Sequence, residues 1–257
     1  MRRPPSQAVA ARNRGVLERV QQLKGEHPFW GYRRIWAHLR FVDGLRVNKK
    51  RVYRMMQRQG LLVKPDRKLK ARRVSHRPKP RPTRPNQWWG IDLTKVMTET
   101  GWVYLVLVLD WYTKKIVGHH TGRRATGPDW LLALRRALNR QFPDSRRPEE
   151  LSLMSDNGSQ PASLGFMRGC ARLGVRQAFT CYNNPRGNAD TERMMRTLKE
   201  ELVWLREWKG ETDLAEAVNG WIETYNETYL HSALGYQPPN RFEKTYNLSP
   251  MTPYQAA

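Results

Sequence analysis

The spacing of apolar residues along this chain changes near residue 87, and the change divides the sequence into two parts. Up to Gly60, apolar side chains recur every three or four positions, as they do on one face of a helix. From Gln87 onward, short apolar runs alternate with amphipathic helical segments, which is typical of strands that return through helices. The pattern therefore predicts an all-α module followed by an α/β domain.

The first part predicts three helices. The first spans about Ala8 to Lys24, and Asp43-Gly44 marks a turn between the second and the third. Asn48 is suited to cap the third helix and Gly60 to end it. The apolar positions expected to pack the helices together are Val16, Val20, Leu23, Tyr32, Ile35, Trp36, Leu39, Val52, Met55 and Met56. Two short helices joined by a tight turn suggest a helix-turn-helix.

The second part predicts elements in the order β-β-β-α-β-α-β-α. The expected strands are Trp88–Val96, Trp102–Asp110, Lys114–Thr121, Leu151–Ser155 and Val175–Thr180. The expected helices are Pro128–Gln141, Pro161–Leu173, a segment around Glu192 whose Met194, Leu198, Leu202 and Leu205 face the core, and Leu214–Tyr229. This is the element order of a ribonuclease-H-like fold. The predicted fold class is therefore α/β, with a ribonuclease-H-like catalytic core behind an N-terminal all-α helix-turn-helix module.

The charge of the chain points to a polyanionic partner. Its 46 Lys and Arg against 23 Asp and Glu give a net charge of +23, and residues 1–86 carry 25 of the basic residues but only 4 of the acidic ones. Nucleic acid is the default partner of such a module. The basic residues expected to contact a duplex from the first part are Arg33, Arg34, Lys49, Lys50, Arg51, Arg54 and Arg58. The alternative is a solvated basic face on a small helical bundle.

Domain boundaries follow from composition. Residues 1–63 form the helix-turn-helix module, and residues 64–86, which are basic and contain Pro78, Pro80, Pro82 and Pro85, form a semi-extended linker. Residues 87–247 form the catalytic core and 248–257 a tail. No apolar run approaches the roughly 20 residues that a membrane span requires. We therefore expect no membrane partner and place the protein in the cytoplasm, at the bacterial nucleoid.

Three acidic residues are the candidate chemistry. Asp92 lies inside a predicted strand, Asp156 directly follows the buried run Leu151–Ser155, and Glu192 lies one turn into a predicted helix. Carboxylates without His or Cys form a hard oxygen site that suits Mg²⁺ or Mn²⁺. Two such ions typically support in-line phosphoryl transfer, one at the attacking oxygen and one at the leaving oxygen.

Other acids compete with these three. Asp110 ends the most apolar strand, Asp190 lies two positions before Glu192 and so faces away from it on a helix, and Glu99 lies in a hairpin. We interpret Asp110 as structural. Arg196 and Lys199 follow Glu192 at i+4 and i+7 on one helix face, where they could hold a DNA backbone. The alternative is an ordinary Glu–Arg ion pair, worth a few tenths of a kcal/mol.

The ordered motifs WWGIDLTKV, YLVLVLDWYTKKIVGHH, SDNGSQPAS, NPRGNADTERMMRTLKEE and YNETYLHSALGYQPPNRFE carry a resemblance to a known family. Together with the 35 residues between Asp156 and Glu192, they resemble the catalytic core of retroviral integrases and of bacterial insertion-sequence transposases. The chain is most similar to the OrfB product of the insertion-sequence-three family, from about Glu26 to Tyr246. The resemblance implies that Asp92, Asp156 and Glu192 are the catalytic, metal-binding triad.

The resemblance also implies a function and partners. The expected activity is metal-dependent cleavage and strand transfer at insertion-sequence ends, with two Mg²⁺ per site, for which Mn²⁺ would substitute. Expected partners are double-stranded DNA (terminal repeats and target), further copies of the chain on paired ends, and an upstream OrfA-type product or a frameshift fusion to it. Residues expected to contact DNA in the core are Asn157, Arg186, Asn188, Arg196 and Lys199. The alternatives are a DNA-binding regulator whose ribonuclease-H-like domain is not catalytic, and a nuclease without strand transfer.

Overall fold

The computed structural model describes residues 7–63, 80–144, 150–180 and 187–248. The chain forms two compact units, Met1–Arg72 and Arg73–Ala257, and each is described here by itself. Most of the expected linker and of the expected tail, as well as Arg186, lie outside the described residues. The domain boundaries at 63 and 86 therefore stay predictions. No helix among the described residues is long and apolar enough to cross a membrane.

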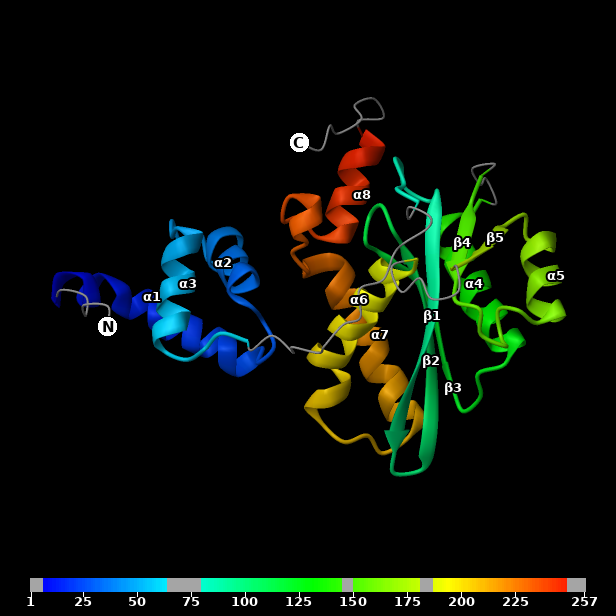
Figure 1. Ribbon diagram of the computed structural model, residues 1–257, viewed down its shortest axis with the longest axis horizontal. Coiled ribbons are helices and arrows are strands. Elements are labelled where there is room, and N and C mark those ends of the chain that lie inside the picture. Colours follow the sequence, from blue (N-terminus) through cyan, green and yellow to red (C-terminus); the bar gives the residue numbers. More distant parts are fainter. Residues whose placement is uncertain (1–6, 64–79, 145–149, 181–186, 249–257) are drawn as a thin grey trace, which may run out of the picture. The chain divides into compact units, whose positions relative to one another are not determined.

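The elements follow the expected order with shifted ends (Figure 1). The helices of the first unit are α1 (Gln7–Glu26), α2 (Tyr32–Phe41) and α3 (Lys49–Arg58). The strands of the second unit are β1 (Trp88–Thr98), β2 (Gly101–Asp110), β3 (Ile116–Gly122), β4 (Ser152–Ser155) and β5 (Arg176–Phe179). Its helices are α4 (Gly127–Gln141), α5 (Leu164–Arg172), α6 (Ala189–Glu201), α7 (Glu211–Thr228) and α8 (Pro239–Leu248), with short 3-10 turns at Val203–Leu205 and Ser232–Leu234.

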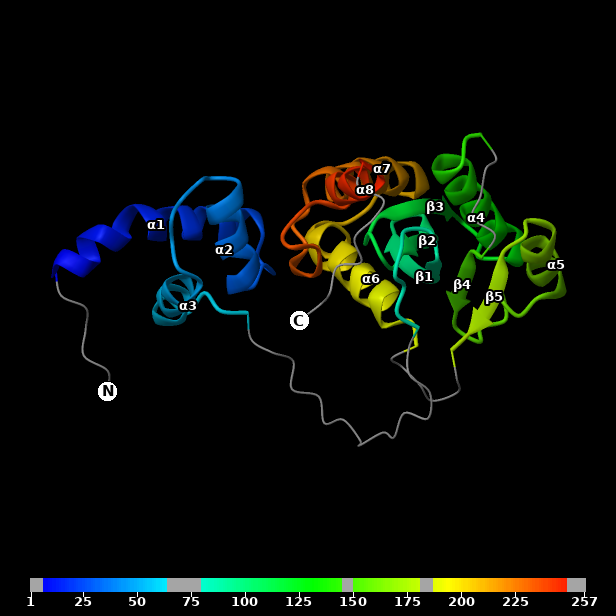
Figure 2. The same cartoon turned by 90° about the horizontal axis from the view of Figure 1, so that it is seen from above.

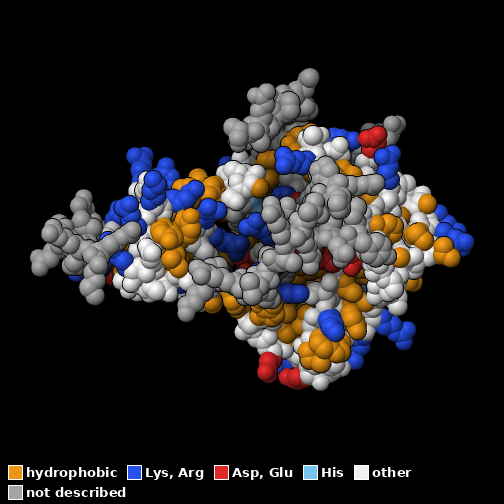
Figure 3. All heavy atoms as spheres, in the orientation of Figure 1, with side chains coloured by type: hydrophobic (Ala, Val, Ile, Leu, Met, Phe, Trp, Pro, Cys, Tyr) orange, Lys and Arg blue, Asp and Glu red, His pale blue; other side chains and the backbone are white. Residues whose placement is uncertain are grey.

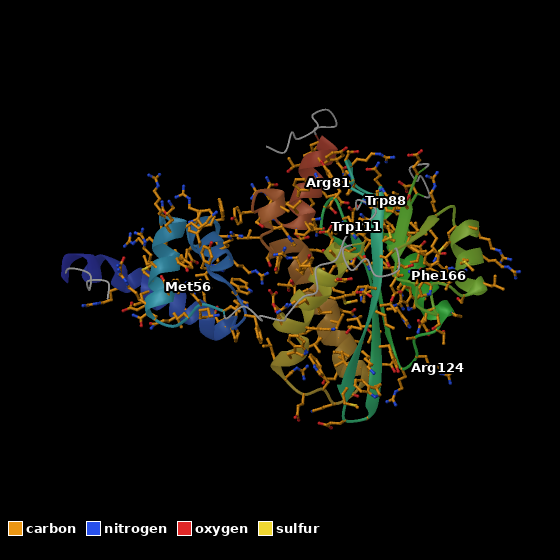
Figure 4. The ribbon with its side chains drawn as sticks, viewed as in Figure 1. Met56, Arg81, Trp88, Trp111, Arg124 and Phe166 are labelled. Carbon is orange, nitrogen blue, oxygen red and sulfur yellow. The ribbon has the colours of Figure 1, made fainter. Side chains whose placement is uncertain are left out.

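The first unit is a three-helix module whose core was predicted from its apolar spacing. Met56, for example, is fully buried among the helices (Figure 4). The Asn48 side chain accepts a hydrogen bond of 2.8 Å from the Lys50 N–H and so caps α3, as expected. The Arg19 guanidinium pairs with the Asp43 carboxylate at 2.9 Å, which ties α1 to the turn after α2.

The second unit is a five-stranded sheet between two layers of helices. Its strand order is β3-β2-β1-β4-β5, with antiparallel pairing among β1, β2 and β3 and parallel pairing of β4 with both β1 and β5. Helices α6, α7 and α8 cover one face, and α4 and α5 cover the other (Figures 1 and 2). This is the predicted ribonuclease-H-like arrangement, and it puts β1 at the centre of the sheet.

Side-chain alternation along the strands assigns each residue to one of two cores. Leu107 of β2 packs into the core under α6 and α7, whereas Val108 packs into the core under α4 and α5. On β1, Trp89 and Ile91 belong to the α4–α5 core. Because neighbouring residues of a strand point to opposite faces, the intervening positions of β1 face α6. Asp92 is one of the residues on that face.

Two expectations were wrong in detail. The helix expected from Pro161 begins at Leu164, because the Ser163 side chain accepts a hydrogen bond from the Phe166 N–H and caps the helix there. Leu205, expected in the core, is 48% exposed. The cause is that α6 ends at Glu201 and the chain continues as a 3-10 turn, which rotates Val203 inward in its place.

The rival acid Asp110 is a structural residue, as we interpreted it. Its carboxylate is fully buried at the end of β2 and accepts backbone hydrogen bonds from Asn86 (2.6 Å), Tyr112 (2.7 Å) and Thr113 (3.1 Å). Burial raises the pKa of Asp110 to about 6, although the three N–H donors act in the opposite direction. The carboxylate therefore joins the entry into β1 to the β2–β3 turn.

Replacing Asp110 by Asn is expected to destabilise the second unit at pH 7 by about 1–3 kcal/mol, because the amide cannot accept all three N–H bonds and leaves a buried donor unsatisfied. Urea unfolding measures this loss. Because its raised pKa means that wild type gains stability when Asp110 takes up a proton, the difference from wild type is expected to grow as the pH falls through about 6. An equal stability of the two proteins at pH 7 would show that the bonds contribute nothing.

Candidate active site

Asp92 and Asp156 lie next to each other on the α6 face of the sheet. The parallel pairing of β1 with β4 brings Gly90 opposite Met154, and the two acids lie two residues further along their strands. Adjacent strands are about 4.8 Å apart. Met154 packs into the core under α6 and α7, so a residue two positions on faces the same side. The sheet therefore brings together two acids that are far apart in the sequence.

The electrostatics of Asp92 link it to three other charged residues. The pKa of Asp92 is raised to about 6. Burial is the largest cause, and the carboxylates of Asp156 and Glu192 act in the same direction. A 2.8 Å hydrogen bond from the Leu93 N–H and the positive charge of Lys199 lower it. Charged residues from the end of β4 and from α6 therefore act on the carboxylate of Asp92 in β1.

A pKa above the ordinary value means that the ion-free protein loses stability as Asp92 ionises. The folded state holds the proton of Asp92 more tightly than the unfolded chain does. Protonated Asp92 therefore contributes its full stabilisation below about pH 4, and this stabilisation is lost as the pH rises through about 6. In EDTA at pH 8, Asp92→Asn is expected to be more stable than wild type by on the order of 1–2 kcal/mol. Thermal unfolding at several pH values measures the difference, which should be smaller at pH 5 than at pH 8 and should vanish below about pH 4.

Asp156 lies in a short loop that is fixed by its neighbours. Its Oδ1 accepts a hydrogen bond of 3.1 Å from the Gly158 N–H. The Asn157 amide donates to the Thr180 carbonyl at 2.6 Å, which joins the loop to the end of β5. The amide of Asn157 thus holds the loop, and the contact of this exposed residue with DNA stays a prediction.

The first turn of α6 is bonded to β1 beside Asp92. Asn188 donates to the Ile91 carbonyl at 3.2 Å, and the Trp111 indole N–H donates to the Thr191 hydroxyl at 3.0 Å. Asn188 is only 3% exposed, so it positions α6 and does not face DNA as predicted. Trp111 in turn stacks on Trp88, with ring centroids 6.0 Å apart (Figure 4). These contacts fix the helix that carries Glu192.

A glycine makes this approach possible. A Cβ built on Gly90 would lie 1.9 Å from the Thr191 hydroxyl and 2.4 Å from the Trp111 indole nitrogen. No side chain fits there without moving α6. Gly90, Trp111 and Thr191 were not among the residues singled out from the sequence. The one signal was a glycine inside an otherwise apolar strand, which often marks close approach of another segment.

The α6 residues divide between the site and its surroundings. Glu192 is exposed on the first turn, and Asp190 pairs with Lys114 at 3.4 Å, which agrees with its exclusion as a catalytic acid. Arg196 pairs with Glu200 at 2.8 Å and is itself largely exposed. Within the described ranges, no three Asp, Glu, His or Cys side chains lie close enough together to hold a metal ion as they stand.

The basic residues predicted on the first unit differ in their surroundings. Lys49 lies 4.4 Å from the Trp36 ring centroid, and Arg51 donates to Asn13 at 2.8 Å. Arg34 lies over the Trp30 ring and Arg33 next to Tyr32. The exposed stripe of α3 consists of Lys50, Arg54 and Arg58, spaced four residues apart. Lys and Arg side chains gather on this unit in Figure 3.

The strand order and the helices on the two faces of the sheet define a ribonuclease-H-like core of the integrase type. Residues 82–185 and 173–239 match two integrase core domain families, and residues 11–68 match an HTH-like domain. A simian T-cell lymphotropic virus intasome structure has the same fold, with a TM-score of 0.54 at 14% identity over 93% of this chain and 79% of that chain.

Curated relatives give the family. The chain is 30% identical to the transposase for insertion sequence element IS904 of Lactococcus lactis, over 96% of this chain and 99% of the relative. It is 29% identical to the transposase for IS629 of Shigella sonnei, over 94% and 83%. The chain belongs to the insertion-sequence-three family of transposases and is of the OrfB type.

Proposed function

We propose that this transposase cleaves DNA at the ends of its insertion sequence and joins the ends to new DNA, in a reaction that depends on a divalent metal ion. The observation that carries the proposal is the coupling of Asp92 to Asp156 and Glu192, three acids from separate elements. The fold family and the transposase relatives agree with it. Asp92, Asp156 and Glu192 are the proposed catalytic residues.

The acids suit Mg²⁺, with Mn²⁺ as a substitute. Their donor set consists of carboxylate oxygens alone, which hard divalent cations prefer. The mutual repulsion that raises the pKa of Asp92 is relieved when a cation lies between the acids. Glu192 is exposed, so its side chain has room to turn toward the other two. Two bound ions would polarise the attacking and leaving oxygens of an in-line displacement at phosphorus.

The residues of the chain contribute binding and orientation. Asp92 is held by the Leu93 N–H on a central strand, and α6 presents Glu192 from a first turn fixed by Asn188. Lys199 lies near enough to act on Asp92 and is placed to bind the phosphate next to the reacting one. Hydrolysis and joining use the same site, with water or a 3′-OH as the nucleophile. No covalent protein–DNA intermediate is required.

DNA binding by the first unit and association of several copies of the chain complete the proposal. We propose that Lys50, Arg54 and Arg58 contact the phosphates of the terminal repeats from α3. Arg186 lies outside the described residues, and its contact with DNA stays a proposal from the sequence. Copies of the chain would pair two element ends in the bacterial nucleoid, together with an upstream OrfA-type product or fused to it.

The test is a cleavage and joining assay. The protein, with and without an upstream product, is mixed with a labelled duplex that carries the terminal repeat, in Mg²⁺, Mn²⁺ or EDTA. We expect nicked and joined products with either metal and none in EDTA. Binding without cleavage under every condition would contradict the proposal and support the alternative of a DNA-binding regulator. Nicking without joining would identify a nuclease.

A further inference from the structure

A basic cleft lies between α4 and α5, on the face of the sheet opposite the acids. Its volume is about 300 Å³, and three arginines line it: Arg135 from α4, and Arg168 and Arg172 from α5. All three are exposed, and within the described part of the chain none has an ion-pair or hydrogen-bond partner. In Figure 3, Lys and Arg side chains lie along the edge of this unit that α5 forms.

Glycines shape the cleft. Gly169 lets α5 approach α4 closely, since a Cβ built there would lie 2.7 Å from the Leu131 side chain. Gly165, one turn earlier, also lines the cleft, and a Cβ built on it would meet no atom within 4 Å. The two glycines, Leu131 and Leu173 line the cleft together with the three arginines. No carboxylate lines the cleft among the residues described.

The cleft is separate from the candidate active site. Phe166 and Cys170 of α5 are buried in the core under α4 and α5, whereas Asp92 and Asp156 lie on the other side of the sheet, which is covered by α6 with Glu192. Figure 4 shows Phe166 on the α4–α5 side of β1 and Trp111 on the α6 side. The arginines thus cannot serve as phosphate ligands for the reacting centre. They need a partner of their own.

We propose that this cleft binds the sugar-phosphate backbone of a DNA duplex at a second place, outside the catalytic centre. The inference rests on the proposed function, which requires the protein to hold long DNA. Arg168 and Arg172 are one helical turn apart, about 6 Å along the axis. Each strand of a duplex carries one phosphate per about 3.4 Å of its axis, so two successive phosphates lie within reach of the pair.

Guanidinium groups also favour this ligand over other anions. Each presents a planar fork of donors that matches phosphate oxygens, and Arg135 approaches the same space from the opposite wall. A cleft whose polar side chains are all arginines suits a backbone contact that is independent of sequence. The contact would guide DNA along the outside of α5, away from the acids.

The experiment compares the salt dependence of binding to a long duplex without a terminal repeat. Wild type is measured beside Arg135→Ala/Arg168→Ala/Arg172→Ala and a control with the same charge loss, Arg124→Ala/Arg140→Ala/Arg241→Ala, whose residues are exposed elsewhere on the unit. Each lost phosphate contact lowers the slope of log affinity against log salt by about 0.9. The cleft variant is expected to lose roughly 2 to 3 from the slope and about 10- to 100-fold in affinity at 0.15 M salt.

Gly165→Leu tests the cleft without removing charge. The side chain has room at its Cβ, so the fold should be kept while the cleft is filled, and the affinity is expected to fall severalfold. Equal slopes for the cleft and control variants would overturn the proposal, as would a loss of self-association with unchanged DNA binding. Metal-dependent nicking by wild type is measured in parallel. Its absence would refute the proposed function while the slopes still decide the cleft.

Discussion

Replacing Glu192 by Gln is expected to reduce metal-dependent nicking of a terminal-repeat duplex by about 10²–10³-fold or more. The substitution keeps the size of the side chain on an exposed turn of α6, so the fold should be unchanged. It removes one of the two negative charges that act on Asp92 and with it a ligand of the proposed metal ions. Single-turnover cleavage at saturating protein measures the chemical step apart from binding.

The matched control for this change is Glu200→Gln on the same helix. Glu200 pairs with Arg196 at 2.8 Å on a largely exposed surface, and such pairs contribute only a few tenths of a kcal/mol. Its cleavage rate should stay within about twofold of wild type. DNA binding by Glu192→Gln should be equal to or tighter than that of wild type, because a negative charge next to phosphate is removed. Similar rates for all three proteins would exclude Glu192 from the catalytic residues.

Gly90→Ala is expected to damage both stability and activity. The new Cβ would lie 1.9 Å from the Thr191 hydroxyl, so α6 must move away from β1. Overpacking of this kind costs about 1–3 kcal/mol. The shift also carries Glu192 away from Asp92, and a displacement near 1 Å can cost about 10²-fold in rate. Urea unfolding and single-turnover nicking measure the two effects on the same preparation.

Gly220→Ala is the control for this substitution. Gly220 lies inside α7, and a Cβ there meets nothing within 4 Å. Ala should stabilise that helix by about 0.5–1 kcal/mol and leave nicking unchanged. If Gly90→Ala nicks DNA at the wild-type rate, the close approach of α6 to β1 has no role in placing Glu192.

The helices and strands could be predicted because each has a local signal. Strands and helices followed from apolar spacing, and the cap at Asn48 from residue type. The contacts that position the site could not be predicted in this way. Asn188 and Asn157 look like polar loop residues in the sequence, and only the tertiary structure shows that the first is buried against Ile91 and the second bonds Thr180. Leu205 was misassigned because a helix end is decided by packing as well as by propensity.

The basic residues illustrate a second limit. Charge marks Lys49 and Lys50 equally, but Lys49 lies over Trp36 whereas Lys50 is exposed on the α3 stripe. The cluster of arginines in the α4–α5 cleft could not be predicted from the sequence. Arg135 is far along the chain from Arg168 and Arg172, and the net charge of this part of the chain is close to balanced. Their convergence depends on two glycines that let one helix approach another.

The central claim is that Asp92, Asp156 and Glu192 form one divalent-metal site, and Mn²⁺ binding tests it most directly. EDTA-treated protein is titrated with Mn²⁺, and the free ion is followed by electron paramagnetic resonance. Asp92→Asn, Asp156→Asn and Glu192→Gln are each expected to weaken binding at least about tenfold. Asp110→Asn is the control. Among the described residues, the Asp110 carboxylate accepts hydrogen bonds from backbone N–H groups only, so this variant should bind Mn²⁺ as wild type does. Equal Mn²⁺ affinity in all of these proteins would contradict the account.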